Sequence, residues 1–272
     1  MQKFLHMLND YRSALITGGS SGIGLMLAHQ MAELNLKLIL VSENMEQLTK
    51  AEASLKEKYP DGQFKILCCD LSEEREVHKM LTSIHEKGLT IDIVVNNAGF
   101  GTWGRILEVD ERRERAMMNL MINGTYVITK YFLKEMVEKN HGCIVNIASI
   151  AAFQPNPTLA TYGATKSWIY NWTRSISEEL KNQDSMVQCI AICPTPVRTN
   201  FQQASHMSDS KLFDSPFTVD PEDVASDIIK AIRNRKVKSV PVTWLEWMQK
   251  LTLRFPESWR IWIGKQMMAE KK

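Results

Sequence analysis

No apolar run in this sequence is long enough to cross a bilayer, and nothing at its start resembles a signal peptide. Asp10 and Arg12 interrupt a beginning that already lacks a continuous apolar stretch. These absences argue against a membrane span and against secretion. We therefore expect a cytoplasmic protein.

The sequence also lacks a charge excess and any metal-ligand spacing of cysteines. Its 33 Lys and Arg residues stand against 31 Asp and Glu residues, and the net charge of +2 makes nucleic acid an unexpected partner. The five cysteines lie in or beside apolar runs. They predict small core residues in a reducing compartment and no metal site.

What is present is a regular alternation of strand-like and helix-like segments. The 272 residues contain 44% apolar and 24% charged residues, as is ordinary for a soluble globular domain. Strands and helices alternate without repeats or a linker, which predicts a doubly wound parallel sheet of the α/β class. Residues 105–140 are predicted to be largely helical. The predicted strands are 13–16, 36–41, 64–69, 91–95, 143–148, 186–193 and 237–242.

A glycine-rich turn, TGGSSGIG at 17–24, joins the first predicted strand to a helix. Such a turn lets backbone N–H groups approach a phosphate, and the helix N-terminus adds positive potential. A tight turn that binds nothing is the alternative, which the strand–turn–helix context disfavours. Asn-Asn-Ala-Gly at 96–99 ends the fourth strand and suits a loop whose backbone passes close to a ligand.

Glu43 follows the second strand, where a dinucleotide-binding unit meets the adenosine ribose. Its carboxylate would accept a hydrogen bond from a free 2′-hydroxyl and repel a 2′-phosphate, and no basic residue stands beside it. This favours NAD over NADP; the alternative is a solvated acid at a helix start. Asp70, at the end of the third strand, contacts the adenine or caps the next helix.

Residues 143–167 hold the candidate catalytic groups. A buried strand ends at Ser149, and Tyr162 and Lys166 follow at i and i+4, so that they share one helix face. A lysine beside a tyrosine would lower the pKa of the phenol and suit it to acid/base chemistry. Taken alone, a YxxxK pair is more often a surface pair; the glycine turn makes the catalytic interpretation the better one.

Residues 243–272 differ from the rest of the chain in their tryptophan content. Two helical stripes, one on each side of Pro256, are flanked by Lys and Arg. Packing over the mouth of the substrate site is favoured over an interfacial membrane helix. The apolar members of the stripes are Trp244, Trp247, Met248, Leu251, Phe255, Trp259, Trp262, Ile263 and Met267.

In order and spacing, these motifs resemble the short-chain dehydrogenase/reductase family over about residues 12–240. The sequence near Ser149 and the aromatic tail look most like a bacterial branch of this family, related to ketoacyl and hydroxysteroid reductases. The resemblance implies a Rossmann-type dinucleotide-binding and catalytic domain over 1–242, with 243–272 as a helical extension of the same domain. It also implies a homodimer or homotetramer.

The resemblance implies a role for each matching residue. Tyr162 would be the acid/base, Lys166 would lower its pKa and bind the nicotinamide ribose, and Ser149 would hold the substrate oxygen. The implied cofactor contacts are Gly18, Ser21, Ile23 and Gly24 at the pyrophosphate, Asp70 and Leu71 at the adenine, Asn97 and Gly99 at the adenosine side, and Val197 and Thr199 at the nicotinamide carboxamide.

Two positions depart from the family pattern. Thr195 follows Pro194 where the family has glycine, and Met121 stands where the family has a catalytic asparagine. Asn119 and Asn123 lie two residues away, which turns a helical side chain by about 200°. We expect NAD-dependent hydride transfer at a carbonyl or secondary alcohol of a hydrophobic substrate, acyl or steroid-like. The alternative is a catalytically impaired NAD-binding sensor or scaffold.

Overall fold

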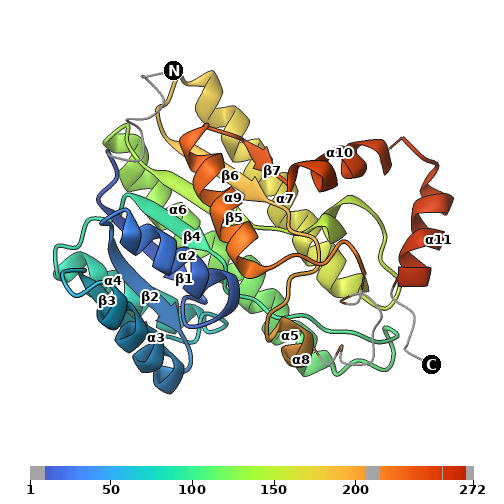
Figure 1. The fold of residues 1–272 in the computed structure, drawn as a ribbon, viewed down its shortest axis with the longest axis horizontal. Coiled ribbons are helices and arrows are strands. Elements are labelled where there is room, and N and C mark those ends of the chain that lie inside the picture. The colour runs from blue at the N-terminus through green and yellow to red at the C-terminus, as the bar shows by residue number, and fades with distance from the viewer. Residues whose placement is uncertain (1–9, 206, 208–212, 214, 253, 268–272) are drawn as a thin grey trace.

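The computed structural model describes residues 10–205, 207, 213, 215–252 and 254–267 (Figure 1). Its centre is a parallel sheet of seven strands in the order β3-β2-β1-β4-β5-β6-β7. This arrangement confirms the predicted Rossmann-type doubly wound sheet. The strands are β1 Ser13–Thr17, β2 Lys37–Ser42, β3 Phe64–Cys68, β4 Ile93–Asn96, β5 Cys143–Ile147, β6 Gln188–Ile192 and β7 Lys238–Ser239.

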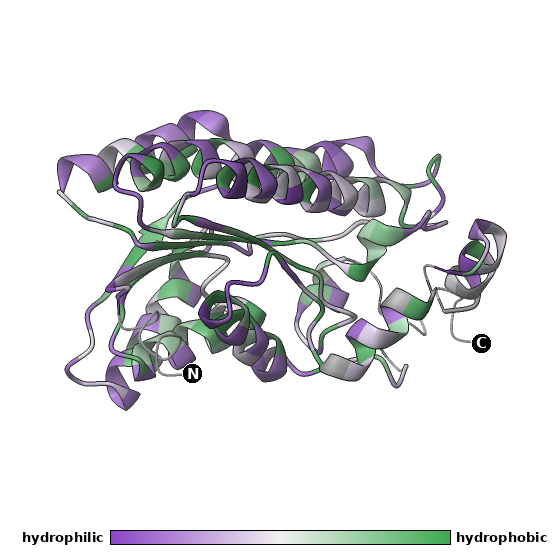
Figure 2. Cartoon of the chain, turned by 90° about the horizontal axis from the view of Figure 1, so that it is seen from above, coloured by the Kyte–Doolittle hydropathy of each residue, from purple (hydrophilic) through white to green (hydrophobic). Residues whose placement is uncertain are grey.

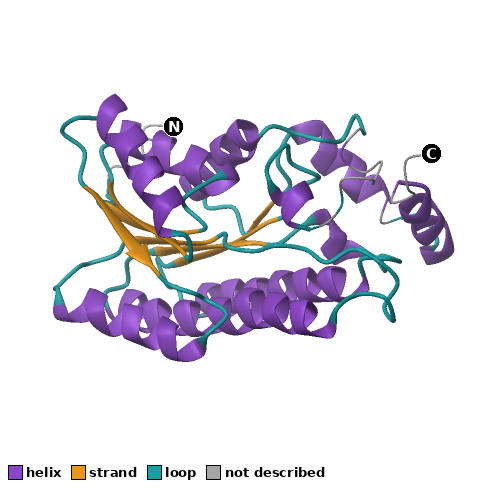
Figure 3. Cartoon of the chain, turned by 90° about the horizontal axis from the view of Figure 1, so that it is seen from below, coloured by secondary structure: helices purple, strands orange, loops and turns teal. Residues whose placement is uncertain are grey.

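Helices cover both faces of the sheet (Figure 3). Contacts join α2 to α3 and α9 on one face, and α4 to α6 on the other, with α7 beside β5 and β6. The described helices are α2 Gly22–Glu33, α3 Met45–Lys58, α4 Glu74–Glu86, α5 Glu111–Met118, α6 Thr125–Glu138, α7 Ala160–Asn182, α8 Phe201–Ala204, α9 Pro221–Arg233, α10 Thr243–Thr252 and α11 Glu257–Met267.

The inner strands are rich in buried apolar residues because both faces of the sheet are covered. In β1, Ala14 and Ile16 pack into one core and Leu15 into the other, and all three are fully buried. Figure 2 shows the same arrangement as apolar strands between helices whose outer faces are polar. Continuous apolar runs, rather than alternating ones, therefore marked these strands in the sequence.

Two predicted elements differ from the structure. The helix expected over 105–140 begins only at Glu111 and contains a π-helical turn, Asn119–Gly124, between α5 and α6. The strand expected over 237–242 is reduced to Lys238–Ser239 at the sheet edge. Pro241 lacks the N–H group that a longer ladder would need.

The two C-terminal helices lie at one end of the molecule, beyond the edge of the sheet (Figure 1). Leu245 anchors α10, since its side chain is buried in the main core. Residues 253 and 268–272 of the predicted tail lie outside the described residues. Within the described part of the chain, no helix is long and apolar enough to cross a membrane.

Candidate active site

The glycine turn packs so tightly at Gly18 and Gly24 that neither position has room for a side chain. Gly18 adopts a φ of 62°, and a Cβ on Gly24 would lie 2.2 Å from the Gly18 carbonyl oxygen. The Asn97 side chain donates to the carbonyl oxygens of Thr17 and Gly18, at 2.9 and 3.2 Å. The loop after β4 therefore holds the loop after β1 in place.

The turn leads directly into the N-terminus of α2. Ser21 is the N-cap residue of α2 in extended conformation, and its side chain makes no cap bond. Ser20 ties the turn to the end of β2 through Ser42, at 3.1 Å, and to Gln47 of α3, at 3.4 Å. This geometry, a glycine cradle before a helix N-terminus, fits a pyrophosphate.

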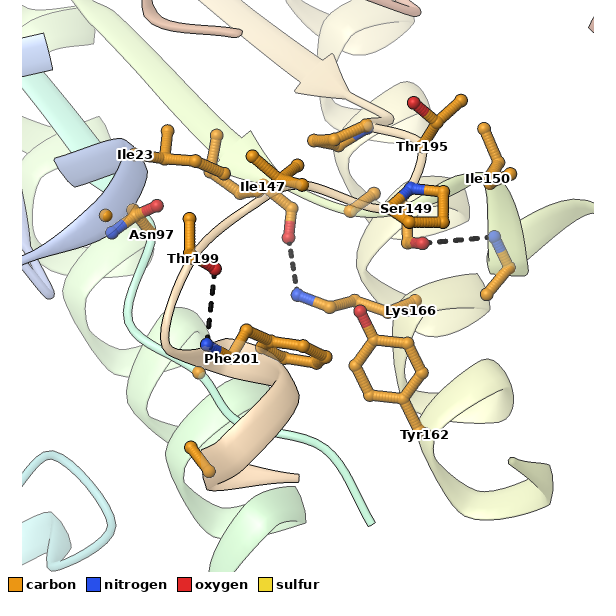
Figure 4. Close-up of a pocket in the computed structure, with 18 of the residues that line it drawn as sticks. Ile23, Asn97, Ile147, Ser149, Ile150, Tyr162, Lys166, Thr195, Thr199 and Phe201 are labelled. Carbon is orange, nitrogen blue, oxygen red and sulfur yellow. Dashed lines mark hydrogen bonds between the residues drawn. The ribbon is translucent and has the colours of Figure 1, made fainter. Parts of the chain in front are cut away.

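The three candidate catalytic residues converge at the carboxyl end of β5 (Figure 4). Lys166, only 5% exposed, donates its Nζ hydrogen bond to the Ile147 carbonyl oxygen at 2.8 Å. The same nitrogen lies 5.7 Å from the centre of the Tyr162 ring. Two residues beyond β5, Ser149 points its hydroxyl into the same space.

Ser149 has two tasks at this point. Its Oγ accepts a hydrogen bond from the Ala151 backbone at 3.1 Å and caps the 3₁₀ turn Ile150–Phe153. Since the oxygen accepts there, its own hydrogen is available to Tyr162, and this hydrogen bond lowers the pKa of the phenol.

The pKa of Tyr162 nevertheless departs from the sequence prediction. Burial raises it to about 12 and outweighs the bond from Ser149. Burial also lowers the pKa of Lys166, to about 8. The charge of Lys166 does not reverse this rise, since Nζ donates to the Ile147 carbonyl and lies over the ring, 5.7 Å from its centre.

A cavity of about 380 Å³ joins the glycine turn to the candidate catalytic residues. Ten of the predicted site residues line it, and four do not. Those that line it are Gly18, Ser21, Ile23, Asn97, Gly99, Ser149, Tyr162, Lys166, Val197 and Thr199. Those outside its lining are Gly24, Glu43, Asp70 and Leu71.

Each of the four residues outside the cavity lining makes a different local contact. Gly24 is the closely packed member of the turn, as described above. Glu43 is exposed after β2, and its backbone oxygen accepts from the Cys68 thiol at the end of β3. Asp70 accepts from the backbone and hydroxyl of Ser72, so it orders the turn before α4. Leu71 lines a second, smaller hollow with Asn119 and Asn123.

The substrate side of the cavity is formed by residues that were not among the predicted site residues. The segment after Ser149 supplies part of the wall, and its Asn156 donates to the carbonyl oxygens of Ala151 and Gln154. The Phe201 ring lies 5.6 Å from that of Tyr162. Cavity-lining residues absent from the prediction include Gly22, Gln47, Gln154, Asn156, Leu159, Phe201, Ala204, Met207, Phe213 and Gly264.

Met121 lies beside Lys166, in the position where the family pattern has asparagine. It is 1% exposed, and a Cβ on Gly99 would lie 2.7 Å from its sulfur and 3.9 Å from Lys166 Nζ. Asn119 and Asn123 are exposed and bond to each other at 3.1 Å. Neither amide therefore takes the place of the missing one.

A buried polar chain behind the site was also not predicted. Asn96 of β4 donates to Thr129 of α6 at 2.9 Å and to Asn146 of β5 at 2.8 Å. Asn146 in turn donates to Thr173 of α7 at 2.9 Å. These hydrogen bonds connect α7, which carries Tyr162 and Lys166, to the central strands and so hold the helix in position against the sheet.

Comparison with known proteins agrees with this geometry. The family model for short chain dehydrogenases matches residues 12–209, and the chain belongs to this family of oxidoreductases. An uncharacterized oxidoreductase of Staphylococcus epidermidis is 29% identical over 198 residues, covering 73% of this chain and 83% of that protein. Hydroxysteroid dehydrogenase-like protein 1 of Gallus gallus is 30% identical over 223 residues, with coverages of 81% and 65%.

Two further comparisons concern a relative with a different name and a solved structure. A very-long-chain 3-oxoacyl-CoA reductase-like protein of Arabidopsis thaliana is 33% identical over 181 residues, covering 65% of this chain and 57% of that protein. A short-chain dehydrogenase from Sphingobium yanoikuyae in complex with NADPH has the same fold, with a TM-score of 0.78 and 22% identity over 91% of this chain and 97% of that one. Members of the family carry a nicotinamide cofactor, and the cradle described above fits one.

Proposed function

We propose that this protein reduces, or in reverse oxidises, the carbonyl/secondary-alcohol group of a neutral hydrophobic substrate, with NAD as cofactor. The observation that carries the proposal is one cavity that joins the glycine turn to Ser149, Tyr162 and Lys166. Gly18, Ser21 and Ile23 would hold the pyrophosphate, and Val197 and Thr199 the nicotinamide end. The bound cofactor would supply or accept the hydride.

The protein's own groups would handle the proton. Since the pKa of Tyr162 is about 12, the residue is a phenol at neutral pH and can donate its proton to a carbonyl oxygen. Ser149 would hold that oxygen by a hydrogen bond, so that the carbonyl carbon faces the nicotinamide. In the opposite direction Tyr162 must first lose its proton, and the charge of Lys166 favours the phenolate. Oxidation is therefore expected to rise with pH.

The lining of the cavity supports a neutral, apolar substrate. Lys166 is the one charged residue among the described lining residues, and its Nζ is already bonded to Ile147. Leu159 and Met207 are buried together in a small apolar cluster, and Phe201 and Phe213 pack against them. The names of two relatives, a very-long-chain 3-oxoacyl-CoA reductase-like and a hydroxysteroid dehydrogenase-like protein, support an apolar group around the reacting carbonyl.

The choice of NAD rests on Glu43. Its exposed carboxylate follows β2, and the two serines of the turn, Ser20 and Ser21, carry no positive charge for a 2′-phosphate. The fold relative from Sphingobium yanoikuyae binds NADPH, so the preference requires its own test. A cytoplasmic location and a homodimeric or homotetrameric assembly belong to the same proposal, and light scattering after size-exclusion chromatography tests the assembly.

The experiment that tests the function follows reduced-cofactor absorbance with a panel of hydrophobic ketones. Matched ketones with an added carboxylate serve as controls, because the apolar wall would leave that charge unpaired. We expect turnover of the neutral ketones and little of the acids. Tight cofactor binding without turnover of any ketone would instead favour the sensor, for which Met121 and Thr195, whose buried hydroxyl has no hydrogen-bond partner, are the supporting positions.

A further inference from the structure

The two C-terminal helices expose an unusual set of aromatic side chains. Trp247, Trp259 and Trp262 are each about 60% exposed, at 63%, 60% and 61%. By contrast, Trp103, Trp168 and Trp172 in the main domain are partly buried. We call the exposed set the aromatic tail surface; it consists of Trp244, Trp247, Phe255, Trp259 and Trp262.

Each helix concentrates its indoles on one face. Trp244 and Trp247 of α10 are three residues apart, as are Trp259 and Trp262 of α11, and such pairs are neighbours on a helix surface. Phe255 stacks on Trp259 with ring centres 6.1 Å apart, and so extends the surface of α11 across the break at Pro256. Large aromatic groups left exposed in this way mark a contact with something else.

The side of α11 that faces the domain lies at the rim of the active-site cavity. Arg260 donates to the Phe153 carbonyl oxygen at 2.9 Å, and Gly264 is buried and lines the active-site cavity. A Cβ on Gly264 would lie 3.3 Å from the Gln154 side-chain nitrogen. One side of α11 is therefore part of the cavity rim, while Trp259 and Trp262 point elsewhere and remain exposed.

The charge of the tail favours a lipid surface over a second copy of the chain as the partner of the aromatic tail surface. Residues 243–272 contain more basic than acidic side chains. In a symmetric pair of chains the same positive tail would face itself, and like charges repel. An anionic lipid surface attracts it instead, and tryptophan with Lys or Arg is the composition of helices that lie in a membrane interface. The basic residues are Lys250, Arg254, Arg260, Lys265, Lys271 and Lys272, and the acidic ones Glu246, Glu257 and Glu270.

We propose that the aromatic tail surface seats this protein on an anionic phospholipid bilayer, with the rim of the active-site cavity next to the lipid. The helices α10 and α11 have 10 and 11 residues, about half of what crosses a bilayer, so they would lie along the interface. An apolar substrate dissolved in the membrane would then reach the cavity past Gly264 without crossing water. This last step rests on the proposed function, whereas the seating itself does not.

Vesicle flotation of the full chain tests the seating. The probe is phosphatidylcholine vesicles with about 30% phosphatidylglycerol, compared with pure phosphatidylcholine. The variant Trp259→Ser/Trp262→Ser removes two exposed indoles of α11. The matched control, Met186→Ser/Val237→Ser, removes two exposed apolar side chains. They lie just before β6 and β7, at the amino ends of the strands and away from the cavity. Binding of each variant to NAD, measured without vesicles, verifies that it is folded.

We expect the wild type and the control to float with anionic vesicles, and the tryptophan variant to lose on the order of tenfold or more in partitioning. Equal flotation of the variant, or no flotation of the wild type, would overturn the proposal. A variant that loses self-association, while the wild type ignores vesicles, would assign the surface to a second copy of the chain.

Activity separates the seating from the function. The tryptophan variant should turn over a water-soluble ketone like the wild type and a vesicle-dissolved ketone more slowly. Equal rates with the vesicle-dissolved ketone would refute the access route. If no ketone is turned over by any form while flotation behaves as expected, the proposed function fails and the seating stands.

Discussion

The two halves of the active-site cavity are built in different ways. On the cofactor side, hydrogen bonds hold the parts together: Asn97 holds the glycine turn, and Lys166 is bonded to β5. On the substrate side, the wall consists of apolar side chains in contact, such as Leu159 with Met207 and Phe201 beside Tyr162. Directional bonds fix the position of the chemistry, whereas apolar contacts fix only size and polarity. The reaction is thus specified more sharply than the substrate.

The largest expected effect lies in the cofactor half, at Lys166. Lys166→Met should lower turnover by about 10²- to 10⁴-fold, because the charge beside Tyr162 is lost. It should also stabilise the protein at pH 7, by on the order of 3 kcal/mol, since burial lowers the pKa of Lys166 from 10.5 to about 8. The unfolded chain binds that proton more tightly, so stability of the wild type falls as pH drops from about 10.5 to 8.

Thermal unfolding of both forms between pH 6 and 11 checks this sign. The gain of the variant should be complete below about pH 8 and vanish towards 10.5. A variant that is less stable than the wild type at pH 7 would show that the bond to Ile147 outweighs the burial of the charge.

The buried polar chain is the next point at which to break the cofactor half. Asn146→Ala removes one hydrogen-bond partner from Asn96 and one from Thr173, which keep their bonds to Thr129 and Ile169, and should cost about 2–3 kcal/mol of unfolding free energy. Denaturant unfolding measures this cost. Asn123→Ala is the control, because it removes an exposed amide that bonds only to Asn119, and it should change stability by less than about 0.5 kcal/mol. Equal effects would refute the role of the chain.

The substrate half should respond in binding alone. Phe201→Ala removes a ring from the wall beside Tyr162, and should raise KM for a bulky apolar ketone by about tenfold while the Kd for NAD stays the same. Steady-state kinetics and a separate cofactor titration measure the two constants. A change in cofactor affinity as large as that in KM would contradict the division of the cavity into two halves.

The smallest effect is expected at Glu43, which lies outside the cavity lining. Glu43→Arg should shift the ratio of NADP to NAD affinity by about tenfold towards NADP, through one new contact with a 2′-phosphate. The control is Glu46→Arg, since Glu46 is an exposed acid of α3 paired only with Lys50. If the wild type already binds NADP at least as tightly as NAD, the argument from Glu43 is wrong.

The same division explains what could be predicted from the sequence. The glycine turn and the Tyr162–Lys166 pair are local patterns, since spacing along one helix or turn determines their geometry. Gln47 and Gly264 escaped prediction because they come from distant segments that only the fold brings to the cavity. The pKa of Tyr162 was predicted in the wrong direction, because burial is a tertiary property that spacing does not report.

The tail was the least predictable region. A stripe of aromatic residues at helical spacing predicts an amphipathic helix but does not say what covers it. The structure places Gly264 at the cavity and leaves Trp259 exposed, so part of α11 packs as expected and part does not. Composition cannot tell which side of α11 packs on the domain and which stays exposed, since this depends on where Pro256 turns the chain.

The most direct test of the account is hydride transfer in a single turnover by the variant Tyr162→Phe. The enzyme is saturated with reduced cofactor, mixed with a neutral hydrophobic ketone, and followed by absorbance. We predict a cofactor Kd within about twofold of the wild type and a transfer rate lower by about 10²- to 10⁴-fold, because only the acid/base group is removed. A transfer rate equal to that of the wild type would contradict the assignment of Tyr162 as the proton donor.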